Sequence, residues 1–295
     1  METELTVSEN GFPGIYYPGD KYPDRAVIYA GGGGSSKEES IASAAFIKDA
    51  GFSMLLLGWY KWENTPKELR KVPVDYAEKA VRWLKEVQAG QKIIMAGPSE
   101  GAVYTLLAAS LIPDINAVAA VSPLDYVTSA PLEKDNGMAV FTWHDEELPY
   151  TPADVSERGM FSLVRDARRD KKYGIKRLSR YVYDTTAVNE ASRICVENSK
   201  AALYLMAPQD DDIWPSDEAV VRIAKKLKRC GYEYPVQTKI YDRASHMIGG
   251  DFDKLSGLGM AMFRHFIRSE SLYHEECQKA RTECMSDMLK FFAEV

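Results

Sequence analysis

The alternation of short apolar runs with amphipathic segments is the feature that most constrains the fold of this 295-residue chain. Six runs have the length of a buried strand: RAVIYA (25–30), SMLLLG (53–58), KIIMAG (92–97), AVAAVS (117–122), AALYLMA (201–207) and VQTKIY (236–241). Between them, four segments carry apolar residues at the i, i+3, i+4 spacing of a helix: residues 36–50, 74–88, 100–111 and 216–230. This β-α-β-α order predicts an α/β fold with a mostly parallel central sheet and helices on both faces.

The alternation is interrupted between residues 124 and 200, where the chain is first rich in proline and charge and then strongly basic. No run in this stretch predicts a strand of the sheet, and its 77 residues are too many for a simple crossover. We therefore expect a single domain, residues 1–295, with a cap inserted at about residues 124–200 over the carboxyl edge of the sheet.

Two helical patterns follow residue 251, and the second of them, residues 274–295, has an apolar stripe. The stripe consists of Cys277, Cys284, Met288, Phe292 and Val295. We expect it to pack on the flank of its own domain, because that is the usual place of an amphipathic helix. A contact between the subunits of a homodimer is the alternative.

Composition and charge argue against several classes of protein. The net charge of −6 gives no general attraction to nucleic acid or to an anionic membrane. The first ten residues, METELTVSEN, are acidic where a secretory signal is basic, and no segment reaches the roughly 18 apolar residues of a membrane span. The four cysteines form no C-x-x-C pair. We expect a cytoplasmic protein with reduced thiols, no metal site and no cofactor.

The pentapeptide GPSEG, residues 97–101, has the G-x-S-x-G pattern of a nucleophile elbow. It follows the apolar run KIIMA and precedes AVYTLLAASLI, so it has the strand, turn and helix that an elbow requires. Such a turn forces serine into a strained backbone conformation, and Gly97 and Gly101 remove side chains that would collide with it. The sequence thus predicts a nucleophile at Ser99. A plain helix N-cap is the alternative.

A serine nucleophile needs a histidine base, and the chain has four histidines. His246 follows the run VQTKIY, so its loop is expected at the carboxyl edge of the sheet, near the elbow. His265 lies within an apolar helical pattern, His274 at a polar helix start and His144 in the expected cap. We therefore predict that His246 is the base, with a surface histidine as the alternative.

Three adjacent aspartates follow the strand AALYLMA: Asp210, Asp211 and Asp212. We favour Asp211 as the acid that orients the histidine, because a turn three residues past the strand end, followed by Pro215, directs its side chain inward. Asp210 is the second choice, and a solvated acidic loop is the alternative. The chain order Ser99, Asp211, His246 is that of α/β-hydrolases.

Four consecutive glycines, residues 31–34, follow the first predicted strand. A backbone N–H approaches a substrate oxygen most closely where no Cβ obstructs it. We predict an oxyanion hole formed by the backbone N–H groups of Gly33 and Glu100. The G-x-x-x-x-G-K-[ST] spacing of a phosphate loop is absent, and a flexible turn is the alternative.

Several longer stretches resemble one protein family. They are GGGGSSKEESIASAAFIKDAGFSMLLLGWY, VPVDYAEKAVRWLKE, GPSEGAVYTLLAAS, FTWHDEELPY, ICVENSKAALYLMAPQDDDIWPS and YDRASHMI. Over nearly all of residues 24–250 the chain is similar to the catalytic domain shared by acyl-CoA thioesterases and the bile acid-CoA:amino acid N-acyltransferase, which has an α/β-hydrolase fold. The resemblance implies a nucleophile at Ser99, an acid within Asp210–Asp211 and a base at His246.

The chain departs from this family in three respects. Mammalian members carry a β-sandwich domain before the catalytic domain, whereas about two dozen residues precede the first predicted strand here. The amidating enzyme uses cysteine as its nucleophile, so Ser99 favours hydrolysis. Glu100 stands where relatives commonly carry lysine.

A basic stretch in the expected cap, residues 165–180, has eight Lys or Arg residues and two Asp residues. CoA carries a pyrophosphate and a ribose phosphate, which basic side chains bind and attract over a distance. Together with the resemblance, this predicts that Arg168, Arg169 and Lys172 bind the phosphates of an acyl-CoA. A solvated helix face is the alternative.

These features predict a serine hydrolase that cleaves a small-molecule acyl thioester or ester through an acyl-serine intermediate, with an acyl-CoA as the expected substrate. A carboxylesterase or a peptidase on the same fold is an alternative, because a fold does not fix its substrate. An acyl-CoA:amino acid N-acyltransferase and a non-catalytic binding protein are further alternatives. The intact set of serine, aspartate and histidine argues against the last.

Overall fold

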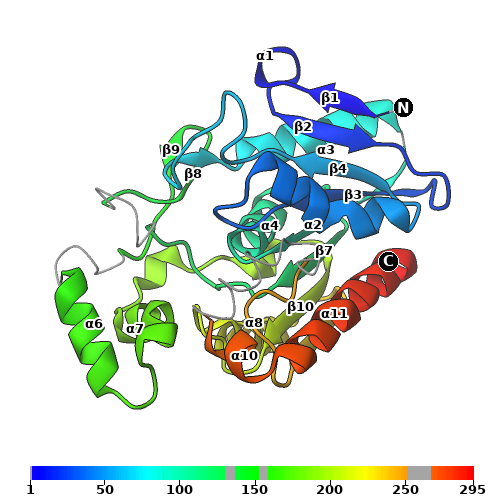
Figure 1. The fold of residues 1–295 in the computed structure, drawn as a ribbon. Helices are drawn as coiled ribbons and strands as arrows, with labels where there is room; N and C mark the ends of the chain where they lie inside the picture. Colours follow the sequence, from blue (N-terminus) through cyan, green and yellow to red (C-terminus); the bar gives the residue numbers. More distant parts are fainter. Residues whose placement is uncertain (1, 89, 130–136, 153–158, 251–266) are drawn as a thin grey trace.

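A central eight-stranded sheet organises the molecule (Figure 1). The computed structural model describes residues 2–88, 90–129, 137–152, 159–250 and 267–295. The strand order is β1-β2-β4-β3-β6-β7-β10-β11. The strands are β1 (Thr3–Leu5), β2 (Gly14–Tyr17), β3 (Arg25–Ala30), β4 (Ser53–Leu57), β6 (Lys92–Pro98), β7 (Ala117–Val121), β10 (Ala202–Pro208) and β11 (Val236–Tyr241). The strands from β4 to β11 in this order are parallel, whereas β1 and β2 are antiparallel additions at one edge.

All six predicted strands are present, and each lies within one residue of its predicted bounds. Their apolar runs are continuous because the inner strands are covered on both sides: in β3, Ile28 faces one core and Val27 the other. Strands β1 and β2 were not predicted from the sequence. β1 is only three residues long and exposes two of them, so it has no detectable apolar run.

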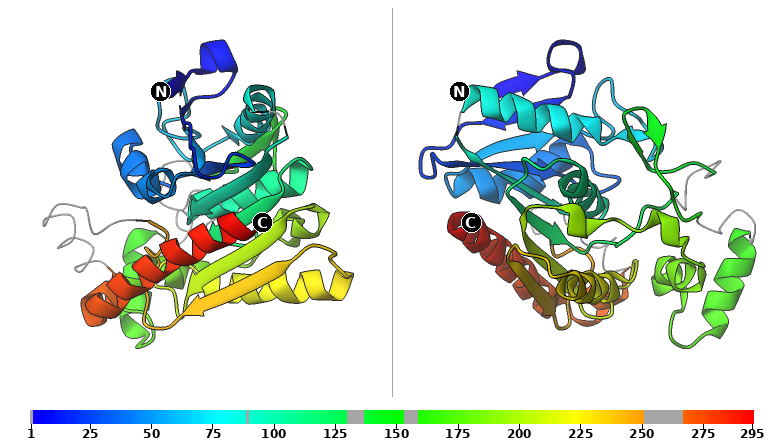
Figure 2. Two further views of the ribbon diagram at one scale, coloured as in Figure 1. Left: turned by 90° about the vertical axis from the view of Figure 1, so that its right-hand side faces the viewer. Right: turned by 180° about the vertical axis from the view of Figure 1, so that it is seen from behind.

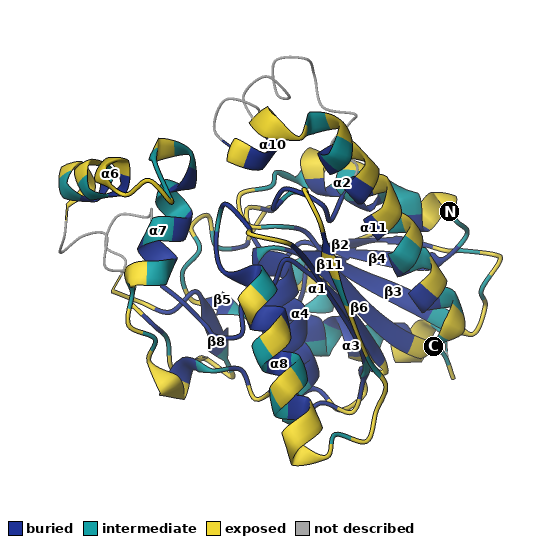
Figure 3. Cartoon of the chain, turned by 90° about the horizontal axis from the view of Figure 1, so that it is seen from below, coloured by how far each residue is buried: buried dark blue, intermediate teal, exposed yellow. Residues whose placement is uncertain are grey.

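Helices cover both faces of the sheet (Figures 2 and 3). One face packs against α2 (Lys37–Asp49) and α11 (His274–Glu294), and the other against α3 (Asp75–Val87), α4 (Glu100–Leu111) and α8 (Ser216–Cys230). The predicted helices 36–50, 74–88, 100–111 and 216–230 are therefore confirmed. Two short helices, α1 (Val7–Asn10) and α10 (Arg268–Leu272), complete this part of the chain. No helix of the described residues is long and apolar enough to cross a membrane.

The described residues between 124 and 200 add no strand to the eight-stranded sheet. They do contain strands β8 (Phe141–Trp143) and β9 (Glu146–Glu147), which the sequence analysis missed and which join β5 (Val72–Pro73) in a separate small sheet. The rest includes α6 (Met160–Arg169), η1 (Ile175–Arg177), α7 (Leu178–Thr185), η2 (Glu190–Ser192) and η3 (Val196–Asn198). Figures 1 and 2 show α6 and α7 to one side of the sheet.

Helix α11 packs on its own sheet, as the stripe predicted. Cys277, Cys284, Met288 and Phe292 are fully buried, and the Phe292 ring lies edge-on to Phe52 at 5.9 Å. Strand β3 also holds the end of the helix, because Nη1 of Arg25 donates to the carbonyl oxygens of Phe292 (2.9 Å) and Ala293 (2.6 Å). All four cysteines of the chain are free thiols.

We expect Phe292→Ala to lower the free energy of unfolding by about 3–5 kcal/mol, because it empties a core site. Lys290→Ala, an exposed change on the same helix, is the control and should shift it by less than about 0.5 kcal/mol. Urea denaturation at two protein concentrations measures both. A midpoint that depends on concentration would instead place this face of α11 between subunits.

Candidate active site

Ser99 occupies the sharp turn between β6 and α4. Its backbone has φ 55° and ψ −126°, a strained conformation for a residue with a side chain. A Cβ at Gly97 would lie 2.5 Å from the carbonyl oxygen of Ala30, and one at Gly101 would collide with the same oxygen. Both glycines are needed because the end of β3 passes directly against the turn, which is the geometry of a nucleophile elbow.

His246 lies beside the serine. Its Nε2 is 2.8 Å from Oγ of Ser99, and its Nδ1 is 2.7 Å from Oδ2 of Asp211. His246 is 3% exposed and Asp211 is fully buried. The three residues follow β6, β10 and β11, and the parallel direction of these strands brings their carboxyl ends to one edge of the sheet.

Both oxygens of the buried Asp211 carboxylate accept hydrogen bonds. Besides the bond to His246, its Oδ1 accepts from the backbone N–H of Ile213 at 2.8 Å, and its Oδ2 accepts from the hydroxyl of Ser216 at 2.5 Å. The neighbouring Asp210 has a side chain that is 59% exposed and pairs with Arg177 instead. Of the two aspartates considered from the sequence, the structure thus brings Asp211 to the histidine.

The His246 ring is also held by an aromatic neighbour. Trp214 packs edge-on against it with ring centroids 5.1 Å apart, and its indole N–H donates to the carbonyl oxygen of Ser122 at 2.9 Å. The Ser122 hydroxyl donates to the carbonyl oxygen of His246 at 3.0 Å. These contacts fix both the ring and its backbone, and the sequence analysis did not identify Trp214 or Ser122.

The other histidines are placed elsewhere. His144 is exposed, with Nε2 3.7 Å from Glu78, and its backbone N–H donates to Asp75. His274 lies 3.7 Å from Glu270. His265 is outside the described residues. Within the described ranges, Asp75, Glu78 and His144 are the one group with the spacing of metal ligands, and they lie at a helix start and a hairpin turn rather than at Ser99.

The glycine loop lies against the elbow. A Cβ at Gly32 would sit 3.8 Å from Cβ of Ser99, and one at Gly33 would sit 3.1 Å from Cβ of Glu100. The loop is anchored by the indole N–H of Trp59, which donates to the carbonyl oxygen of Gly31 at 3.1 Å. Glu100, the residue after Ser99, is 7% exposed, and burial raises the pKa of its carboxyl to about 7.

Two buried arginines hold the loop that carries Asp211. Arg177 is 1% exposed, with Nη2 2.6 Å from Asp210 and Nε 3.1 Å from Asp212. Arg180 donates to the carbonyl oxygen of Asp211 at 2.9 Å. Asp212, whose pKa is raised by burial, also accepts two hydrogen bonds from Ser269. Both arginines belong to the basic stretch 165–180, and its sequence does not distinguish them from the other basic residues.

The structure therefore divides the basic stretch 165–180. Arg168 and Arg169 are exposed at the end of α6, and no ion pair or hydrogen bond of their side chains is found among the described residues. Lys172 is also exposed, but its ammonium lies 3.3 Å from Asp184 and 3.0 Å from the hydroxyl of Tyr173.

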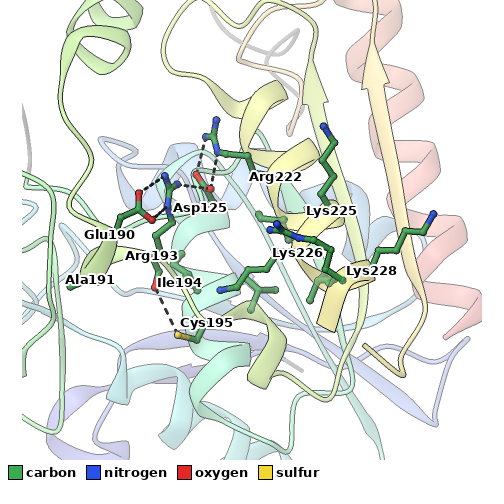
Figure 4. A pocket seen from close by; sticks show the side chains of 14 residues that line it. Asp125, Glu190, Ala191, Arg193, Ile194, Cys195, Arg222, Lys225, Lys226 and Lys228 are labelled. Carbon is green, nitrogen blue, oxygen red and sulfur yellow. Dashed lines mark hydrogen bonds and ion pairs between the residues drawn. The ribbon is translucent and has the colours of Figure 1, made fainter. Parts of the chain in front are cut away.

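A separate cavity of about 990 Å³ lies between residues 190–196 and α8 (Figure 4). None of the residues that line it is Ser99, Asp211 or His246. Its basic side chains are partly neutralised, because Arg193 and Arg222 both pair with the buried carboxylate of Asp125. We assign it no role in the candidate site.

The fold is that of an α/β-hydrolase. The chain superimposes over its whole length on a putative dienelactone hydrolase from Klebsiella pneumoniae, with a TM-score of 0.53, 13% identity and 99% of that chain covered. A structure described as DcsB in complex with its substrate analogue gives a TM-score of 0.58 at 14% identity, with 100% of this chain and 98% of that chain covered. At such identities the likeness concerns the fold alone.

The chain belongs to the family described as BAAT / acyl-CoA thioester hydrolase C terminal, whose model matches residues 72–293. Peroxisomal succinyl-coenzyme A thioesterase of Mus musculus is 27% identical over 229 residues, which are 77% of this chain and 49% of the mouse protein. Acyl-coenzyme A thioesterase 1 of Mus musculus is 25% identical over 249 residues, which are 83% of this chain and 54% of that protein. The chain thus spans about half the length of the curated relatives it matches.

We expect Arg177→Gln to destabilise the protein by about 3–5 kcal/mol, because it leaves the buried Asp212 carboxylate without its cationic partner. Arg168→Gln, from the same basic stretch but exposed, should change the free energy of unfolding by less than about 0.5 kcal/mol. Chemical denaturation measures both variants. Equal effects of the two substitutions would contradict the division of the stretch.

Proposed function

We propose that this chain is a serine hydrolase that cleaves acyl thioesters, with Ser99 as nucleophile, His246 as base and Asp211 as the orienting acid. The observation that carries the proposal is the continuous chain of contacts from Oγ of the half-buried Ser99 through both ring nitrogens of the buried His246 to the buried Asp211. A binding protein has no need of this arrangement on a strained turn, whereas nucleophilic catalysis requires it.

In the proposed reaction, Ser99 Oγ attacks the acyl carbonyl carbon while Nε2 of His246 takes the hydroxyl proton. The carboxylate of Asp211 keeps the Nδ1–H tautomer and stabilises the imidazolium. The C–S bond then breaks, and the imidazolium gives its proton to the leaving thiolate. Water, activated by His246, hydrolyses the acyl-serine ester in the same way and returns Ser99 to its starting state.

The oxyanion of each tetrahedral intermediate needs donors that are already in place. We assign them to the backbone N–H groups of Glu100 and Gly33. The first lies at the N-terminus of α4, where the helix dipole also favours negative charge. The second lies in the glycine loop, which packs closely against Glu100, because a Cβ at Gly33 would lie 3.1 Å from Cβ of Glu100.

We also propose that residues 124–200 form the cap over this site. Tyr183 of α7 packs edge-on against Trp214 at 5.7 Å, and Trp214 packs against His246, so this segment reaches the triad through two aromatic contacts.

Membership of a family with acyl-CoA thioesterases favours a thioester substrate. A carboxylesterase would use the same residues, and an N-acyltransferase would release the acyl group to an amine instead of water. A cytoplasmic location and a homodimer stay predictions.

We expect Asp211→Asn to reduce kcat by about 10³–10⁴-fold, because His246 loses the partner that sets its tautomer. Asp210→Asn, which removes an exposed carboxylate from the next position, should change kcat by less than about threefold. Steady-state hydrolysis of a short acyl-CoA measures both, with Ser99→Ala as the inactive reference. If Asp210→Asn is the more damaging change, the assignment of the acid is wrong.

Labelling by a fluorophosphonate provides an independent test of the nucleophile. The parent protein should be labelled at Ser99, and Ser99→Ala should not be labelled although its thermal unfolding is unchanged. Thioester hydrolysis by Ser99→Ala within tenfold of the parent rate would refute the proposed mechanism.

For CoA recognition we propose that Arg168 and Arg169 bind phosphates, with Lys172 beside them. We expect the double change Arg168→Glu and Arg169→Glu to raise KM for an acyl-CoA several-fold, and the parent KM to rise with ionic strength. The same acyl group on N-acetylcysteamine, which has no phosphate, is the control and should respond to neither. Equal responses of the two substrates would exclude these arginines from CoA binding.

A further inference from the structure

Glu100, the residue that directly follows the proposed nucleophile, carries a largely buried carboxyl group that the reaction itself does not require. Only its backbone N–H enters the proposed oxyanion hole. Its side chain is 7% exposed, and no hydrogen bond or ion pair of that carboxyl is found among the described residues. Burying an ionisable group without a partner is costly, and such groups often mark functional sites.

The surroundings of Glu100 belong to the site. Cβ of Glu100 faces Gly33, and that glycine also approaches the side chain of Leu69. From α7, Tyr183 is close enough for the Glu100 charge to raise the pKa of its hydroxyl further than burial alone does. Tyr183 packs on Trp214 and Trp214 on His246, so the charge of Glu100 acts on a side chain that two aromatic contacts connect to the triad.

Among the residues that the structure describes, no Lys or Arg side chain forms an ion pair with this carboxyl. The charge of Glu100 acts on Tyr183 of α7. The glycine loop has no charged side chain of its own, and Lys61 contacts it through Nζ, which donates to the carbonyl oxygen of Gly34 at 3.5 Å. Leu69 lies between Glu68 and Arg70, and these two pair with each other at 2.8 Å. The negative charge of an ionised Glu100 is therefore available to a bound substrate.

The enclosed position indicates which part of the substrate meets Glu100. A leaving group must depart toward solvent, whereas the acyl group stays attached to Ser99 through the second half of the reaction. A side chain that is enclosed next to the nucleophile thus contacts the acyl group.

We propose that Glu100 determines acyl-group specificity: it favours an acyl group that carries a hydrogen-bond donor, above all an ammonium, and disfavours one that carries a carboxylate. This inference rests on the proposed function. A carboxylate accepts charge-assisted hydrogen bonds from an ammonium or hydroxyl, and the low-dielectric surroundings strengthen both this attraction and the repulsion of a second carboxylate.

The preference depends on pH. Burial raises the pKa of Glu100 to about 7, so the carboxyl is mostly neutral at pH 6 and mostly ionised at pH 8. Selection for an ammonium over a carboxylate therefore increases as the pH rises through 7. A change that affects the rate with every substrate equally cancels in a ratio of two substrates.

The test uses three N-acetylcysteamine thioesters that share one neutral leaving group. β-Alanyl and butyryl thioesters have the same size, with an ammonium in place of a methyl group, and the succinyl thioester supplies a carboxylate. For the parent protein at pH 8 we expect kcat/KM for β-alanyl to exceed that for succinyl at least tenfold, and by less at pH 6. Glu100→Gln should bring the ratio within about threefold at both pH values, and Glu100→Lys should invert it.

Glu146→Gln, which removes an exposed carboxylate of β9, is the matched control and should keep the parent ratio. A parent ratio below about twofold, or a ratio that Glu100→Gln leaves unchanged, would overturn the inference. Binding of the same thioesters to Ser99→Ala, measured as dissociation constants, gives the preference for β-alanyl over succinyl without turnover. Loss of Ser99-dependent hydrolysis of the butyryl thioester would contradict the proposed function, whereas a flat ratio with that hydrolysis intact contradicts only the role of Glu100.

Discussion

The carboxylate of Asp211 carries a charge with no access to solvent, and the carboxyl edge of the sheet is arranged around it. A buried charge is tolerated only when its acceptor oxygens are satisfied. Here His246, Ser216 and a backbone N–H provide the donors, so one electrostatic requirement links the loops after β10 and β11 to the start of α8. Arg180, from the segment between residues 124 and 200, donates to the Asp211 carbonyl oxygen and joins a fourth part of the chain to the same point.

The parallel strands and the turn at Ser99 could be predicted from short sequence patterns. The parallel strands are buried on both faces and read as continuous apolar runs. The elbow could be located because a strained turn beside β3 tolerates only glycine at positions 97 and 101. Since the carboxyl ends of parallel strands share one edge, the strand assignments were also enough to predict that Ser99, Asp211 and His246 come together.

The properties that sequence could not supply depend on contacts between distant segments. Charge runs are normally solvated, and nothing in the stretch 165–180 distinguishes Arg177, which pairs with two aspartates, from Arg168, which faces water. Glu100 is polar and begins a helix, where an acidic residue is ordinarily exposed. Part of its burial comes from the loop at Gly33, which is remote in the chain.

The position of α11 has a consequence for biosynthesis. Val27 and Tyr29 of β3 belong to the core that α11 closes, yet the helix residues that cover this core lie about 260 positions later. At roughly 5–20 residues per second, a ribosome needs about 13–52 s to make the intervening chain. During this time α2, which follows β3 directly, can cover only its own part of that face, and the part that α11 covers stays uncovered until residues 274–294 have been made.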